Sequence, residues 1–132
     1  MTDHIRAGFR QQADVCRAAG SPLTAEVLVS LGIILDGSTR TGARILGWEG
    51  DPLGDAMPLR IAGGLHALAR SGKDAALTEL YTRQTGDMPR ILSRVLEGCD
   101  DWLCEWLDSP PQTNEVARSA ALWPGMMHIA RR

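Results

Sequence analysis

A polar stretch near the end of the chain carries residue types that could bind a ligand. It covers residues 108–119 and holds two adjacent prolines before a predicted helix that begins after Thr113. Asn114, Glu115 and Arg118 lie in the first turns of that helix, where free backbone N–H groups and the positive dipole end can hold an anion or a polar group. The alternative is helix capping by Thr113 with a Glu115–Arg118 pair. Asn114, Glu115 and Arg118 are therefore ligand-binding candidates.

A second group surrounds two adjacent glycines in a predicted helix. Gly63 and Gly64 together cost about 2 kcal/mol of helix stability relative to alanines, so the close approach of another helix or of a ligand should offset them. His66 follows near the same face and could act as a general base or contact a ligand. The alternative is a histidine that is hydrogen-bonded in a helix–helix contact. His66 and Arg60 are the weaker ligand-binding candidates.

Acidic residues form two further groups. Glu49, Asp51 and Asp55 could do general acid–base chemistry as paired carboxylates, but helix capping and solvent exposure explain them more simply. The acidic residues between 97 and 108 are interpreted as a solvated helix face that is partly paired with Arg94.

The cysteines and histidines do not have the spacing of metal ligands. Cys99 and Cys104 are five residues apart on a predicted helix, so their side chains should point in different directions. The histidines at 4, 66 and 128 are far apart in the sequence, and we predict no metal site. No phosphate-binding or dinucleotide-binding glycine motif is found in the sequence either.

Composition limits the classes of protein. The chain has 132 residues, of which 44% are hydrophobic, so a single domain over 1–132 with one core is expected. The net charge is −2 and the sequence contains no block of basic residues, which argues against nucleic acid as a partner. The most apolar stretch, 27–35, is far shorter than the roughly 20 residues of a membrane span. Three cysteines without a CxxC pair, and a charged N-terminal stretch, favour the cytoplasm.

Apolar residues recur every three to four positions along almost the whole chain. This periodicity predicts an all-α fold, an irregular compact bundle of six or seven helices. Asp51 or Asp55 should cap the helix that ends at Ser71, and Asp74 should cap the next one. The predicted helices cover 2–19, a segment from 22 that stops before Gly37, a short piece within 38–50, a segment ending at 71, a short one after 74, one from about 88 to 107 that Gly98 could kink, and 114–131.

Several strings together resemble a known bacterial family. They are GDPLGDAMPLRIAGGLHAL at 50–68, DWL at 101–103 and LDSPPQTNEVARS at 107–119, with FRQQA at 9–13 and GSPL at 20–23. The chain is similar over about 9–130 to the N-terminal part of the uncharacterised family called domain of unknown function 2332.

The resemblance implies that longer family members have a helical N-terminal part and a separate cofactor-binding part. Family members are typically more than twice this length and continue into a strand and a glycine-rich turn that looks like the cofactor loop of S-adenosylmethionine-dependent methyltransferases. The 132 residues do not include that turn, so we expect either a fragment or a short family member, with no cofactor bound by this chain alone. We expect a helical domain that covers or completes the active site of a methyltransferase-like protein. The alternative is a non-enzymatic interaction module.

The last predicted helix is apolar on nearly every side. Trp123, Met126, Met127 and Ile129 should therefore form an interface, either with a C-terminal domain or in a homodimer.

Overall fold

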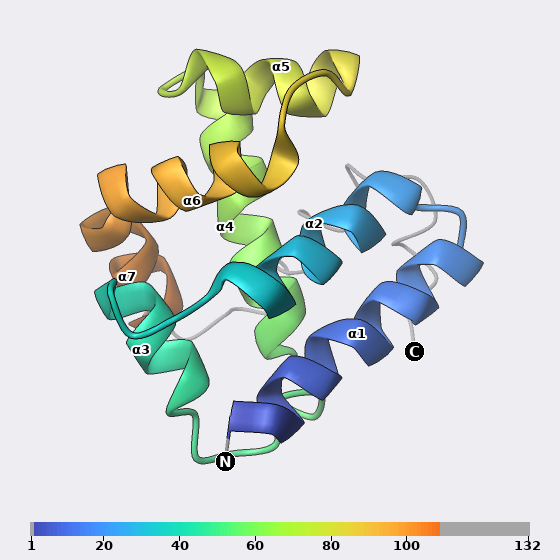
Figure 1. The fold of residues 1–132 in the computed structure, drawn as a ribbon, viewed down its shortest axis with the longest axis vertical. Helices are drawn as coiled ribbons and strands as arrows, with labels where there is room; N and C mark the ends of the chain where they lie inside the picture. Colours follow the sequence, from blue (N-terminus) through green and yellow to red (C-terminus); the bar gives the residue numbers. More distant parts are fainter. Residues whose placement is uncertain (1, 109–132) are drawn as a thin grey trace.

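The computed structural model describes residues 2–108, which form seven helices joined by turns and loops (Figure 1). The all-α prediction is confirmed, and no strand occurs within this part. The predictions on residues 109–132, which include the last helix, lie outside the described residues. The helices are α1 (Thr2–Ala18), α2 (Pro22–Ile34), α3 (Arg40–Leu46), α4 (Met57–Ser71), α5 (Ala75–Arg83), α6 (Met88–Gly98) and α7 (Asp100–Asp108).

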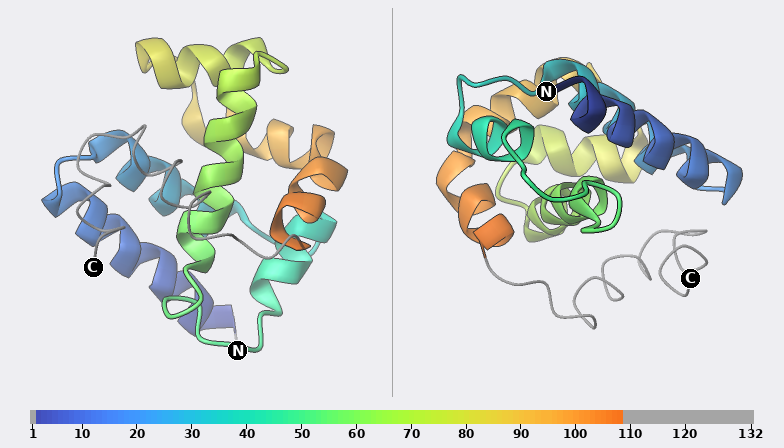
Figure 2. Two further views of the ribbon diagram at one scale, coloured as in Figure 1. Left: turned by 180° about the vertical axis from the view of Figure 1, so that it is seen from behind. Right: turned by 90° about the horizontal axis from the view of Figure 1, so that it is seen from below.

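Helix α4 runs through the centre of the arrangement. Seen from behind, it has α1 and α2 on one side and α3, α6 and α7 on the other, with α5 across one end (Figure 2). It contacts α1, α2, α5 and α7. Five consecutive residues of α4, 61–65, are buried, which is the pattern of a helix that is surrounded on every side. The two glycines therefore lie in the core of the bundle.

The turn between α1 and α2 is built from local sequence signals. Gly20 adopts a φ of +88°, a conformation that glycine tolerates best, and Pro22 occupies the first turn of α2. Ser21 precedes α2 but does not cap its backbone; its hydroxyl instead donates to the Thr24 Oγ1 at 2.9 Å. At the other end of α2, the Arg6 guanidinium donates to the carbonyl oxygens of Gly32 and Leu35, both at 2.8 Å, and so joins α1 to α2.

The expected single helix from 88 to 107 is in fact two helices. The break lies at Cys99, with φ −116° and ψ 23°. It allows Asp100 to turn toward the start of α3, where its carboxylate accepts hydrogen bonds from the Arg40 N–H, the Thr41 N–H and the Thr41 hydroxyl at 2.6–2.9 Å. The apolar stripe keeps its spacing across the break, so periodicity alone did not reveal it.

The acidic side of α7 is therefore not simply a solvated face. Asp101 pairs with Arg40 at 2.8 Å and Asp108 pairs with Arg44 at 2.5 Å, because α3 packs beside α7. The expected pairing with Arg94 was wrong. Arg94 instead pairs with Asp74, whose carboxylate also accepts the Leu77 N–H and caps α5 as predicted.

The predicted aspartate cap of α4 was also wrong. The residue before the helix is Ala56, which has a left-handed conformation with φ 56° and ψ 33°. The Asp55 carboxylate accepts the Trp48 indole N–H at 2.8 Å, and Asp51 accepts the Leu53 N–H at 3.2 Å. Both carboxylates thus fold the loop that precedes α4. Within residues 2–108, no helix has the length and apolar character needed to cross a bilayer.

Candidate ligand-binding groove

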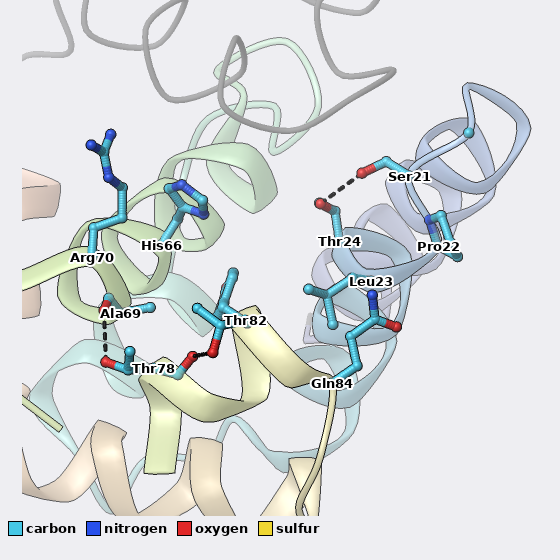
Figure 3. A pocket seen from close by; sticks show the side chains of 12 residues that line it. Ser21, Pro22, Leu23, Thr24, His66, Ala69, Arg70, Thr78, Thr82 and Gln84 are labelled. Carbon is cyan, nitrogen blue, oxygen red and sulfur yellow. Dashed lines mark hydrogen bonds between the residues drawn. The ribbon is translucent and has the colours of Figure 1, made fainter. Parts of the chain in front are cut away.

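A groove of about 630 Å³ opens between the start of α2 and the facing sides of α4 and α5 (Figure 3). Its volume falls within the range of small-molecule sites. The lining residues come from three segments that are distant in the sequence, so only the packing of the bundle creates it. They are Gly20, Ser21, Pro22, Leu23, Thr24, His66, Ala69, Arg70, Thr78, Tyr81, Thr82 and Gln84.

Helix α4 supplies His66, Ala69 and Arg70 to the groove. Positions three and four residues apart share one face of a helix, so these three side chains lie together on the face of α4 that lines the groove. His66 was a candidate from the sequence, whereas Arg70 was not. Its spacing of four residues from His66 was the available signal.

His66 lies against Tyr81 of α5. The two ring centroids are 5.4 Å apart and the ring planes meet at 73°, an edge-to-face contact. Burial, and to a smaller extent the charge of Arg70, lowers the pKa of His66 to about 4. The imidazole is therefore neutral near pH 7. A group with this pKa is a weak general base at neutral pH, so a role in hydrogen bonding fits His66 better than proton abstraction.

Tyr81 stays protonated at neutral pH. Its burial raises the pKa of the phenol well above its ordinary value of 10.0. The ring pair thus forms an uncharged wall of the groove. The contact with Tyr81 therefore does not support an acid–base pair centred on His66.

Hydroxyl groups line the rest of the groove, and three of them already donate their protons within the protein. Ser21 donates to Thr24, Thr78 donates to the Ala69 carbonyl at 2.7 Å, and Thr82 donates to the Thr78 carbonyl at 2.9 Å (Figure 3). A hydroxyl oxygen whose proton is engaged still offers lone pairs. Toward a ligand, these three oxygens therefore act as acceptors.

Arg60 lies elsewhere and holds helices together. Its guanidinium donates to the Leu107 carbonyl at 2.5 Å and lies over the Trp48 ring, 5.7 Å from the centroid. Its own carbonyl accepts the Trp106 indole N–H at 2.8 Å. Arg60 thus links α4 to α7 and to the loop after α3, and the structure does not bring it together with His66 in the groove lining.

The close approach predicted at the paired glycines is confirmed at Gly64. A Cβ atom at this position would lie 3.1 Å from Trp106 Cδ1 and 3.2 Å from Leu103 Cδ2. Both partners belong to α7. Glycine permits this close packing, since a larger residue would require the side chains of α7 to shift by a few tenths of an ångström.

The remaining candidates lie outside the groove. Glu49, Asp51 and Asp55 are exposed around the loop before α4. Asn114, Glu115 and Arg118, and the interface candidates Trp123, Met126, Met127 and Ile129, lie outside the described residues. Within 2–108, no group of three or more histidine, cysteine, aspartate or glutamate side chains is arranged to hold a metal ion.

Comparison with known proteins identifies the family but no close relative. The curated proteins and the solved structures contain no match to the chain. One family model, described as "Uncharacterized protein conserved in bacteria (DUF2332)", matches residues 6–132, which is nearly the whole chain. The strings around Gly63 and Gly64, and between 107 and 119, lie inside this match. The chain therefore belongs to the DUF2332 family of bacterial proteins.

Proposed function

We propose that this chain is a helical domain that binds a small-molecule substrate on behalf of a methyltransferase-like protein. The observation that carries the binding role is the groove between α2, α4 and α5, whose described lining combines an uncharged ring pair, hydroxyl oxygens and one cationic side chain. The groove has the size of a small-molecule site, and it combines apolar surface with polar groups that could orient a ligand. The methyl-transfer role rests on the resemblance of longer family members to S-adenosylmethionine-dependent enzymes.

In its described lining, the groove itself lacks a feature that is typical of sites for cofactors with a ribose. The described lining holds no carboxylate that could bind the ribose hydroxyls of S-adenosylmethionine. The cofactor would instead belong to the glycine-rich turn of the longer proteins. The domain would hold the substrate and shield it from water beside that turn.

Two binding measurements test this proposal. Nuclear magnetic resonance of the labelled 132-residue chain with a library of small soluble compounds should shift amide signals of groove residues. Isothermal calorimetry with S-adenosylmethionine should show no binding. Signals that shift only outside the groove would contradict the binding role, and micromolar affinity for S-adenosylmethionine would contradict the assignment of the cofactor to another part.

A pair of tryptophan variants links binding to the groove. Thr82 is exposed and lines the groove, so Thr82→Trp should fill it and abolish the shifts. Thr85 is also exposed and does not line it, so Thr85→Trp makes the same chemical change as a control. Equal loss of binding in both variants would contradict the location of the site.

Self-association is the alternative function and rests on the sequence alone. It assigns a homodimer interface to Trp123 and its apolar neighbours. Within 2–108 the exposed large apolar residues, Val15, Ile33 and Leu53, belong to different elements and do not by themselves favour an interface. A cytoplasmic location is part of the proposal, and the free thiols of the three cysteines fit a reducing compartment.

A further inference from the structure

We propose that the groove binds a small organic acid, with its carboxylate on Arg70 and with a hydroxyl or amide N–H donor on an uncharged body. This inference rests on the proposed binding function and adds the chemical class of the ligand. It follows from the charge of the lining, from the state of its hydroxyl groups, and from the wall that His66 and Tyr81 form.

The charge of the groove favours a monoanion. Arg70 is the only lysine, arginine, aspartate or glutamate among the described lining residues. His66 adds no second positive charge at neutral pH, because burial beside Tyr81 keeps it neutral. A single guanidinium matches the planar fork of one carboxylate, with two parallel hydrogen bonds. A phosphate dianion would be only half neutralised there.

The hydroxyl groups favour a ligand that carries a donor. Ser21, Thr78 and Thr82 each donate inside the protein, so toward a ligand their hydroxyl oxygens can only accept. A ligand without a donor would displace water from these oxygens and offer them no hydrogen bond in return. The loss of those hydrogen bonds would weaken binding. A hydroxyl or amide N–H on the ligand would satisfy them.

The body of the ligand should be uncharged and partly apolar. Leu23 and Ala69 contribute aliphatic surface, and the imidazole and phenol rings add a flat wall. Arg70 belongs to the same helix as His66 and lies one turn beyond it (Figure 3). A ligand whose carboxylate reaches Arg70 would therefore place its body along the ring pair.

Para-hydroxybenzoate is a suitable probe, because it combines a carboxylate, a flat body and a hydroxyl donor. Its methyl ester lacks the negative charge, and benzoate lacks the donor. Titration of the labelled chain should show para-hydroxybenzoate shifting the amides of residues 66–70 and 78–84. The ester should bind at least about tenfold more weakly, since it loses the charge-assisted hydrogen bonds, and benzoate should fall between them.

Two arginine variants assign the carboxylate to its partner. Arg70 is exposed, so Arg70→Gln should keep the fold and weaken para-hydroxybenzoate about tenfold while leaving the ester unchanged. Arg90 is exposed on α6 and outside the groove lining, so Arg90→Gln removes the same charge without this effect. Circular dichroism checks that both variants are folded.

The outcomes separate this inference from the proposed function. If ester and acid bind equally, and Arg70→Gln changes neither, the groove is a ligand site without preference for an acid and the inference is overturned. If none of the three compounds shifts the groove amides, the organic-acid inference is overturned by that result as well. If other library compounds also fail to bind in the groove, the proposed binding function is contradicted as well.

Discussion

Acid should destabilise the fold through His66. The unfolded chain binds a proton at the ordinary histidine pKa of 6.5, whereas burial lowers the pKa of the folded histidine to about 4. Between these values the unfolded state therefore binds more protons than the folded state. The free energy of unfolding should fall as the pH drops from about 6.5 toward 4, and His66 should add no further loss below that range.

The magnitude follows from the two pKa values. Their difference corresponds to about 3 kcal/mol in full. His66 is only partly buried, and water screens part of this penalty. We therefore expect a loss of about 1–2 kcal/mol between pH 7 and pH 4.5. Asp74 and Asp100 have lowered pKa values and should contribute only at lower pH, because their ordinary value is 3.8.

Urea unfolding at a series of pH values measures this loss. His66→Phe keeps an aromatic ring beside Tyr81 but cannot take up a proton, so its free energy of unfolding should change by less than about 0.5 kcal/mol over the same range. His4 is exposed on α1 and provides the control, since His4→Phe should keep the pH dependence of the original chain. A His66→Phe variant with an unchanged pH dependence would refute the reasoning.

Three further predictions concern packing, capping and association. Gly64→Ala should lower the free energy of unfolding by about 1–3 kcal/mol, because its Cβ would crowd α7, whereas Gly98→Ala meets nothing within 4 Å and should change it by less than about 1 kcal/mol. Urea unfolding that ranks the two alike would contradict the close contact. Asp100→Ala should cost about 1–2 kcal/mol as the loss of a cap, and Asp101→Ala less than about 0.5 kcal/mol as the loss of an exposed pair. Thermal unfolding compares them, and equal costs would argue against capping of α3. If the helix around Trp123 forms an interface, the chain should sediment as a dimer at micromolar concentration, and a monomer would exclude that interface.

Local signals in the sequence were sufficient for most of the helices. Glycine and proline placed the turn between α1 and α2, and Asp74 capped α5, because such effects act within one or two turns of the chain. The paired glycines of α4 also indicated a close helix contact, since their cost to an isolated helix needs compensation.

Contacts between distant segments could not be read in this way. Next to the break at Cys99, Asp100 binds the start of α3, about sixty residues earlier, and periodicity contains no information on a contact over that distance. The same holds for Asp55, which binds the Trp48 indole instead of capping α4. A carboxylate suits several donors, and the tertiary arrangement decides which donor it meets.

The candidate site shows most clearly which features the sequence predicts and which only the tertiary structure decides. The sequence alone determined an all-α chain of one bacterial family and selected His66 as a residue of interest. Its partnership with Tyr81, its place beside Arg70 in a groove, and the inclusion of the α2 start in that groove came only from the tertiary structure. The physical reason is that helix propensity and capping act over a few residues, whereas a groove exists only where three packed helices leave a space between them.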